Sequence, residues 1–375
     1  MKIGVITLHR VRNYGSSLQT LATQRFLEQN GCEAEIIDYY PERYTSRGLL
    51  KRLKNKSDTL ARHPLLLLAA RMIISVSYLR KKIVFDKFLK RHLHCTAQTF
   101  RTEAELKAAC PPADAYCTGS DQVWNSHWNE GVDAPFYLSF PDDSCYRFSF
   151  ASSIGNVRLS GEEAAAVTPM LAKYRHISVR EDKGVEVIEA LGLQAVQLLD
   201  PTLLFPAAQW KAFVSRRYRG KRYVVTYNLH HDKRIDDYAN ALAAKHGLSV
   251  FHISYNLHDI IRKGSLKWCP AIEDYLGLIH DAAYVVTDSF HATVFSVLFH
   301  KQLVVIYPEE ASSRIRSILS LLQMQDRGFE ELPDTAAADA PIDFDRAEAI
   351  LSREREASQV YLNTIIDELH GEGIA

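Results

Sequence analysis

Short apolar runs alternate with segments of helical periodicity along most of this chain, and this alternation limits the possible folds more than any other feature. The run at residues 3–8 is followed by a helical pattern from Ser17 to Asn30, a Gly31 stop and a second apolar run at 34–39. A strand–helix–strand unit of this kind joins two parallel strands. The beginning of the chain therefore predicts a parallel sheet.

The alternation continues in two sets, which predicts two α/β domains. We expect further strands at 115–118, 146–152, 176–180 and 195–199, and then at 222–228, 248–254, 283–287 and 302–307. The apolar turn from Asp200 to Pro206 lies between the sets. We predict two Rossmann-like domains that face a cleft, 1–210 and 211–375, with the boundary between 205 and 222. Residues 333–342 are expected to form a linker, and 343–370 a terminal helix that could cross back to the first domain.

The composition is typical of a globular protein and excludes several classes. Lys+Arg and Asp+Glu each total 45, so net charge does not point to nucleic acid. The six cysteines form no CxxC pair, and no carboxylate cluster demands a metal, so no metal site is expected. Neither a dinucleotide fingerprint nor a P-loop is present. The first ten residues read as a buried strand rather than a signal peptide, so we expect a cytoplasmic protein.

Residues 43–91 depart from this neutral balance, with 14 Lys/Arg and only two acids. The apolar run at their centre, 64–76, is interrupted by Arg71 and is too short to span a bilayer. We expect a helical insertion on the first domain with a solvated basic face. The alternative is peripheral contact with an anionic membrane at its inner face.

The loop after the first strand suits an anion. Arg10, Asn13 and Gly15 lie where this strand leads into a helix N-terminus, and free N–H groups and the helix dipole attract negative charge there. The plain alternative is an ordinary turn capped by Ser16.

A second polar segment follows the strand at 115–118. Ser120, Asp121 and Gln122 stand beside Trp124, and an indole ring flanked by polar groups can hold a sugar. A capped turn with Trp124 in the core fits equally well.

Two further segments place arginines after predicted strands. Arg180 needs a partner at the end of a buried strand, which could be Glu181, Asp182 or an anionic ligand. Ser313 and Arg314 follow the last strand and could clamp a phosphate or carboxylate.

The segment 284–295 runs from a strand into a helix and places His291 in the first helical turn. Histidine is the usual side chain for proton transfer near neutral pH, and this turn lies at the ligand-binding edge of such sheets. Asp288 and Ser289 lie close enough to cap the turn. A structural histidine is the alternative.

Together these segments resemble the polysaccharide pyruvyl transferase family. The matching stretches, in family order up to about residue 327, are LHRVRNYGSSLQTLA, TGSDQVWN, FYLSF, FSFASSIG, ISVRED, LDPTLL, VVTDSFHATVFSVLF and SSRIRSIL. GSDQVWN and DSFHATVFS are the specific ones. The resemblance implies a glycosyltransferase-B-like fold, phosphoenolpyruvate as co-substrate with no other cofactor, and a pyruvate ketal on a hexose of an exopolysaccharide or lipid-linked oligosaccharide.

The resemblance also implies roles for the candidate residues. The catalytic set would be His291, Asp288 and Ser289; the donor-binding set Arg10, Asn13, Gly15, Arg180, Ser313 and Arg314; the acceptor-binding set Ser120, Asp121, Gln122 and Trp124. Family members often carry Arg-Leu-His-Gly where this chain has Ser289 to Ala292. The missing charge would have to come from Arg314, Arg180 or Arg10.

Two other functions compete with this one. A glycosyltransferase of similar fold would use a nucleotide-sugar donor and need an acidic residue for the ribose, for which the sequence offers no clear candidate. A non-catalytic scaffold would bind a membrane surface through residues 43–91 without turnover.

Overall fold

The first sheet is built from the strands nearest the N-terminus. In the computed structural model, which describes residues 1–45, 48, 64–155, 158–308, 312–371 and 373, four strands lie parallel in the order β2-β1-β3-β4. They are β1 (Lys2–Ile6), β2 (Glu33–Ile36), β3 (Ala115–Thr118) and β4 (Tyr146–Ser149). Helix α1 (Tyr14–Gln29) joins β1 to β2 as predicted. A parallel pair, β5 (Ser178–Val179) and β6 (Val196–Gln197), continues the sheet through a bridge between Phe148 and His176.

The second sheet has six described strands, all parallel, in the order β12-β11-β10-β7-β8-β9. They are β7 (Tyr223–Tyr227), β8 (Ser249–Ser254), β9 (Ser265–Trp268), β10 (Tyr284–Thr287), β11 (Gln302–Ile306) and β12 (Gly328–Phe329). The crossover helices are α11 (Lys233–His246), α12 (Ile272–His280), α13 (Phe290–Leu298) and α14 (Ser313–Leu321). The α/β architecture with two parallel sheets agrees with the predicted fold class.

Burial on both faces explains why these strands read as apolar runs. Val224 packs in one cluster with α11, whereas its neighbour Val225 packs on the other face in the cluster that contains α12 and α13. Since helices cover both faces, every residue of β7 is buried.

Shorter elements complete the fold. Among the described residues, the shorter helices are α5 (Glu103–Ala108), α6 (Ser126–Asn129), α7 (Gly161–Leu171), α8 (Asp182–Ala190), α9 (Pro201–Leu204) and α10 (Ala207–Trp210). The 3₁₀ turns are η1 (Glu42–Tyr44), η2 (Ala134–Tyr137), η3 (Lys211–Phe213), η4 (Arg216–Tyr218), η5 (Leu257–Ile261), η6 (Gln325–Arg327) and η7 (Thr335–Asp339). The predicted linker at 333–342 is therefore wrong at its centre, because η7 folds there and buries Ala338.

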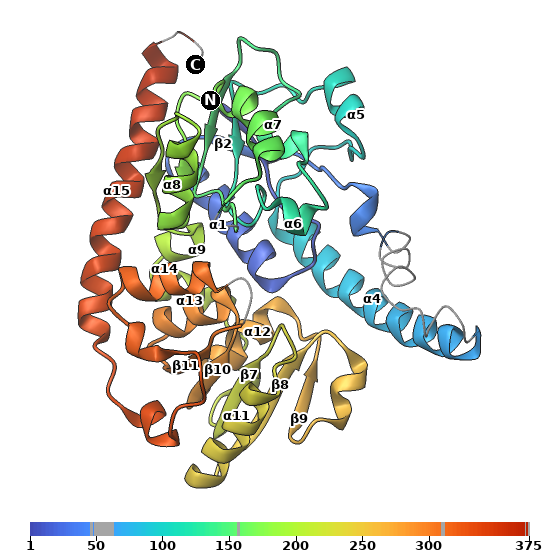
Figure 1. Cartoon of the computed structure of the whole chain (residues 1–375), viewed down its shortest axis with the longest axis vertical. Helices are drawn as coiled ribbons and strands as arrows, with labels where there is room; N and C mark the ends of the chain where they lie inside the picture. The colour runs from blue at the N-terminus through green and yellow to red at the C-terminus, as the bar shows by residue number, and fades with distance from the viewer. Residues whose placement is uncertain (46–47, 49–63, 156–157, 309–311, 372, 374–375) are drawn as a thin grey trace.

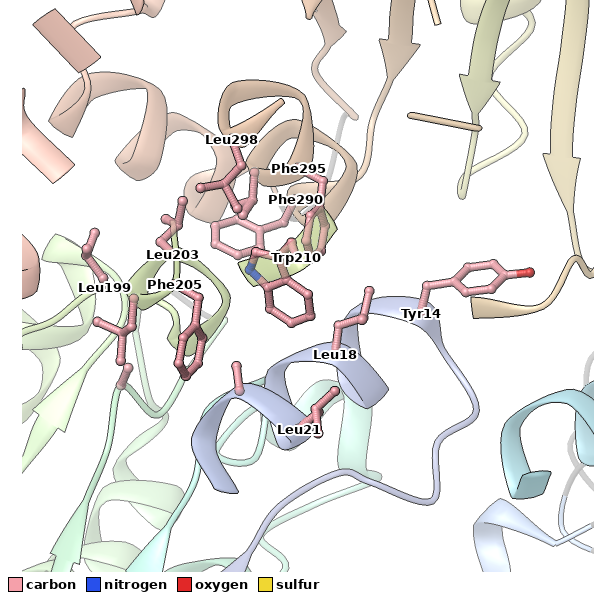
Figure 2. Packing of buried hydrophobic residues seen from close by; sticks show 14 of the residues in the cluster. Tyr14, Leu18, Leu21, Leu199, Leu203, Phe205, Trp210, Phe290, Phe295 and Leu298 are labelled. Atoms are coloured by element: carbon pink, nitrogen blue, oxygen red, sulfur yellow. The ribbon is translucent and has the colours of Figure 1, made fainter. Parts of the chain in front are cut away.

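An apolar core connects the two sheets. Leu18 of α1 and Phe295 of α13 belong to one buried cluster, and Trp210 lies between these helices (Figure 2). The Trp210 and Phe295 rings meet edge to face at 5.1 Å. The predicted boundary between 205 and 222 falls in this packed stretch between β6 and β7, and the assignment of domains 1–210 and 211–375 stays a prediction.

The terminal helix α15 (Phe344–Gly371) runs along the length of the molecule and reaches the first sheet (Figure 1). The hydroxyl of Tyr361 donates to the carbonyl of Ser149 at 2.8 Å, and that of Tyr146 donates to Glu368 at 2.7 Å. The helix therefore ties the end of the chain to β4.

The basic segment contains one long helix, α4 (Pro64–His92), which projects from the first sheet (Figure 1). Its last turns pack on the core through Phe85 and Phe88. Most of the predicted insertion before it, residues 46–47 and 49–63, lies outside the described residues. Within the described part of the chain, no helix is long and apolar enough to cross a bilayer.

Candidate active site

The candidate site lies where the N-terminal ends of α1 and α13 meet. His291 is the second residue of α13, and Ser289 caps this helix by accepting from the backbone N–H of Ala292 at 3.4 Å. The His291 ring packs against Gly15 in the first turn of α1, so closely that a Cβ at position 15 would lie 2.5 Å from Cε1 of the ring. The two predicted loops therefore meet although 276 positions separate these residues in the sequence.

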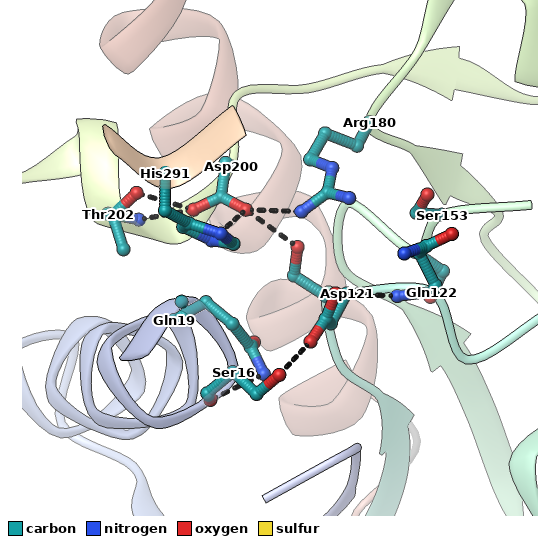
Figure 3. A network of polar contacts seen from close by, with 12 residues as sticks. Ser16, Gln19, Asp121, Gln122, Ser153, Arg180, Asp200, Thr202 and His291 are labelled. Carbon is teal, nitrogen blue, oxygen red and sulfur yellow. Dashed lines mark hydrogen bonds and ion pairs between the residues drawn. The ribbon is translucent and has the colours of Figure 1, made fainter. Parts of the chain in front are cut away.

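An aspartate that we did not predict lies beside His291. Nε2 of His291 lies 3.5 Å from Oδ2 of Asp200, and both side chains are nearly inaccessible (8% and 0% exposed). Asp200 caps α9 and accepts from the backbone N–H of Thr202 at 2.9 Å (Figure 3). Burial alone would raise the pKa of Asp200, but His291 and Arg180 outweigh it and keep that pKa well below the usual range. Asp200 is therefore a carboxylate that can stabilise an imidazolium.

Arg180 joins the same network from the end of β5. Its Nη1 donates to Asp200 at 2.7 Å, its Nε donates to Glu181 at 3.1 Å, and the guanidinium lies 4.4 Å from the centre of the Phe290 ring. Burial opposes the charge, yet the carboxylates of Glu181 and Asp200 keep the pKa of Arg180 above its ordinary value. Of the two protein partners expected for Arg180, Glu181 is confirmed, whereas Asp182 is the first residue of α8 and has no described contact with Arg180.

Arg314 approaches Arg180 from the second sheet. It is the second residue of α14, directly after Ser313. Burial, and after it the charge of Arg180, lower the pKa of Arg314 to about 10, although carboxylates such as Glu181 compensate in part. The two guanidiniums, one from each sheet, are therefore near enough to repel each other.

Both guanidiniums keep buried N–H groups without a hydrogen-bond partner among the described residues. These are Nη2 of Arg180 and Nε of Arg314. Oε2 of Glu181 is likewise a buried acceptor without a described partner. Buried polar groups are rarely left unsatisfied, so this arrangement fits a ligand that is anionic and also carries a hydroxyl donor.

The predicted acceptor residues divide into two groups. Ser120 donates to Asp200 at 3.2 Å, and the hydroxyl of Ser16 donates to Asp121. Both predicted residues therefore belong to the network around His291 (Figure 3). Gln122 lies at its edge, where its side chain accepts from Asn125 at 2.6 Å.

Trp124 does not offer its ring to a sugar, and that prediction is wrong. The side chain is 2% exposed, stacks on Tyr137 at 5.6 Å and donates its indole N–H to the carbonyl of Phe136 at 2.9 Å. Its faces and its polar atom are thus used within the core, as the alternative interpretation expected.

Arg10 pairs with Asp38 and has no described contact with the network around His291, so its predicted donor contact stays a prediction. Its Nε donates to Asp38 at 2.6 Å, and its guanidinium lies 5.4 Å from the centre of the Tyr40 ring. Asn13 of the same loop caps α1 by accepting from the N–H of Gly15 at 2.9 Å. Asn13 and Gly15 therefore shape the helix end that meets His291, while Arg10 stabilises the loop behind it.

Asp288 uses both of its carboxylate oxygens in contacts within the protein. Its carboxylate accepts from the backbone N–H groups of Leu229 and His230 at 2.7 and 2.9 Å, and from Nδ1 of His230 at 2.7 Å. Asp288 therefore positions His230, a residue that we did not predict, and the catalytic role of Asp288 itself stays a prediction. Among the described residues, no group of three His, Cys, Asp or Glu side chains is arranged to hold a metal ion.

Comparisons with known proteins bear on the family and on the fold. A family model described as polysaccharide pyruvyl transferase matches residues 13–310 of the chain. No curated protein matches the sequence.

Two solved structures have a fold similar to that of this chain. The S. aureus protein MnaA in complex with UDP has 12% identity, covers 98% of this chain and 97% of its own, and gives a TM-score of 0.53. UDP-GlcNAc 2-epimerase from Neisseria meningitidis bound to UDP-GlcNAc has 10% identity, covers 98% of this chain and 100% of its own, and gives a TM-score of 0.51. These likenesses confirm the predicted glycosyltransferase-B-like fold.

Proposed function

The chain belongs to the polysaccharide pyruvyl transferase family, and from that premise we propose that it transfers the pyruvyl group of phosphoenolpyruvate to a hexose of a polysaccharide or lipid-linked oligosaccharide, forming a ketal. One observation carries the choice of donor. Arg180 and Arg314 bring buried N–H groups without described partners from the two sheets to the same place, beside the His291–Asp200 pair. Phosphoenolpyruvate has a phosphate and a carboxylate, and guanidiniums bind both groups well. Family members often carry an arginine where this chain has Ser289, and Arg180 and Arg314 would supply that missing positive charge here.

The reaction needs a proton donor and an acceptor for hydroxyl protons. A proton adds to the methylene carbon of the enol, and the positive charge that develops on the neighbouring carbon is attacked by a sugar hydroxyl, which loses its proton. The bond from that carbon to the phosphate oxygen breaks, and phosphate leaves with the electron pair. A second hydroxyl then closes the ketal and loses its proton. Of the two protons released, one restores the acid and one goes to phosphate.

His291 suits the proton transfer in this scheme. Its Nε2 lies 3.5 Å from the Asp200 carboxylate, and Oε2 of Glu181 is free to accept from an acceptor hydroxyl. His291→Gln should lower turnover by roughly 10²–10⁴, the usual worth of a positioned acid–base group, while donor affinity changes less.

The test is an assay of phosphate release from phosphoenolpyruvate against a panel of glycan acceptors, with nucleotide sugars as competing donors. We expect acceptor-dependent phosphate release that is roughly 10²–10⁴ times slower in His291→Gln. Nucleoside diphosphate release from a nucleotide sugar would support a glycosyltransferase instead. Membrane binding without turnover by any donor would support a scaffold.

We also place the enzyme at the inner face of the membrane. Helix α4 exposes Val76, Leu79 and Ile83 on one side, with the exposed Lys87 and Lys90 beside them. Apolar groups flanked by lysines suit an anionic lipid surface. A lipid-linked acceptor would be presented at such a surface.

A further inference from the structure

We infer that His230, held by Asp288, is a second proton-bearing group of this site and binds the phosphoryl group of the donor. The inference rests on the proposed function and adds a phosphate ligand to it. It begins from His230, whose side chain is 45% exposed and feels the charge of Arg314.

The backbone around His230 is fixed in place. Asn228 and Asp232 exchange two hydrogen bonds across the loop after β7, at 2.8 and 3.0 Å. Asp288 reaches this loop from the β10–α13 turn and accepts from two of its backbone N–H groups. The side chain of Asp288 is 1% exposed, whereas that of His230 is 45% exposed. The ring is therefore anchored at its base and open at its outer edge.

The hydrogen bond to Asp288 also decides the tautomer. A carboxylate only accepts, so Nδ1 of His230 carries the proton. Nε2 is left at the open edge, without a partner among the described residues. A ring held in this way can present a protonated Nε2 to an anion.

The charges that face His230 come from three elements. Asp288 raises the pKa of His230 most, through their hydrogen bond, and Asp232 adds to this effect from the same loop. Burial and the charge of Arg314 on α14 act in the opposite direction. Two cations that repel each other gain most from an anion placed between them, and Nε of Arg314 lacks a described partner. A phosphate there would accept from both side chains.

This position gives His230 a task distinct from that of His291. His291 is almost inaccessible and lies against Asp200, so it suits transfer to carbon and from the hydroxyl. When the bond between carbon and the phosphate oxygen breaks, the electron pair goes to that oxygen. A protonated Nε2 of His230 can donate to the departing phosphate and later recover its proton from the second sugar hydroxyl.

The test compares His230→Gln with wild type and with a matched control. His231→Asn alters the neighbouring histidine, whose backbone has φ 57°, a conformation that asparagine tolerates. Dissociation constants of inorganic phosphate, phosphoenolpyruvate and pyruvate are measured on the full chain by calorimetry or NMR titration. His230→Gln should weaken phosphate and phosphoenolpyruvate binding about tenfold or more at pH 6, the usual loss for a charge-assisted hydrogen bond. Pyruvate binding, and all three constants in His231→Asn, should stay at wild-type values.

The pH dependence of phosphate binding shows whether His230 binds phosphate through its positive charge or has only a structural role. The protonated form of His230 exists below its raised pKa, so the ratio of the variant and wild-type constants should fall towards one as the pH rises to 9. Using the ratio cancels the ionisation of phosphate itself. Asp288→Asn should lower the pKa of the His230 ring in an NMR titration and move the fall in the ratio to lower pH.

The outcomes distinguish this inference from the function on which it rests. Equal phosphate affinity of wild type and His230→Gln at pH 6 would overturn the role of His230 and leave the proposed donor intact. A wild-type protein that binds no phosphoenolpyruvate would overturn both.

Discussion

The imidazole ring of His291 occupies the space in which a side chain at position 15 would begin. A Cβ on Gly15 would lie 2.5 Å from Cε1 of the ring, closer than real Cβ atoms approach other groups. Because Gly15 belongs to α1 and His291 to α13, the absence of a side chain at one position allows two helices from different sheets to meet. The same contact keeps Nε2 of His291 near Asp200.

Gly15→Ala should therefore impair the reaction although alanine is the better helix former. The new methyl group forces the His291 ring or the start of α1 to move, so turnover should fall about tenfold or more, because small displacements of catalytic groups are costly. Donor affinity should change less. The assay is phosphate release under saturating phosphoenolpyruvate.

Gly161→Ala is the matched control, since it also adds a methyl group at the beginning of a helix. A Cβ at Gly161 meets no other described atom within 4 Å. Equal turnover in both variants would show that His291 does not depend on the space at Gly15.

The second prediction concerns the loop that carries Arg10. Asp38 is nearly buried and accepts from Arg10, from His9 at 3.0 Å and from Thr99 at 2.6 Å. Asp38→Asn leaves these donors partly unpaired and should lower the free energy of unfolding by about 3 kcal/mol. Arg10→Ala should destabilise less and leave donor affinity unchanged, since Arg10 has no described contact with the network around His291.

The contribution of Asp38 to the stability of the fold depends on pH. Burial alone would raise the pKa of Asp38, but its hydrogen bonds to His9 and Arg10 hold it well below the ordinary value. The carboxylate therefore stabilises the fold above its unfolded pKa, about 3.9, and this stabilisation is lost as the pH falls towards the folded value. Urea unfolding at pH 7 and pH 3 should show the difference between wild type and Asp38→Asn shrinking at the lower pH. A weaker donor affinity in Arg10→Ala would contradict the assignment of Arg10 to the scaffold.

Much of the fold could be predicted from the sequence because its central strands are buried on both faces. The run at 115–118 coincides with β3, since every residue there is buried and apolarity is the signal. Strand β9 escaped prediction because it is partly exposed and mixes polar with apolar residues. Strand β12 was not predicted for a similar reason, because it has only two residues and both are half-buried.

The site was harder to predict because its members gain their roles only through contacts between distant segments. Asp200 and His230 each lie in the segment that follows a strand, and polar residues are also common in ordinary turns. The Asp-Pro pair at 200–201 was the available signal, since it caps α9 at the end of β6. Trp124 shows the converse limit, because composition alone does not tell which side of a turn an indole ring faces.

The third prediction concerns membrane contact by α4. Leu79 and Ile83 are 56% and 55% exposed, so Leu79→Glu with Ile83→Glu should keep the fold and weaken binding to anionic vesicles. Wild-type binding should also fall with added salt, since lysine contacts with a charged surface are screened. Vesicle co-sedimentation at low and high salt checks both effects. Equal binding by wild type and variant, or binding that ignores salt, would contradict a lipid-facing α4.

The last prediction uses two arginines on one helix. Arg314 has a buried Nε without a described partner, whereas Arg316 is exposed, pairs with Glu330 and lies 3.8 Å from the centre of the Tyr307 ring. Arg314→Ala should weaken phosphoenolpyruvate binding about tenfold or more, because it removes a charge-assisted contact. Arg316→Ala removes the same charge from the same helix and should leave donor affinity unchanged.

Removing Arg314 should also relieve its repulsion of Arg180. The folded protein should therefore lose little stability in Arg314→Ala, and its melting temperature without ligand should stay near that of wild type or rise, while the increase caused by phosphoenolpyruvate shrinks. Thermal melts of wild type and both variants, with and without donor, measure these effects together. Equal donor-induced shifts in Arg314→Ala and Arg316→Ala would show that the effect is one of net charge, and the donor site would then have to be sought around Arg180 alone.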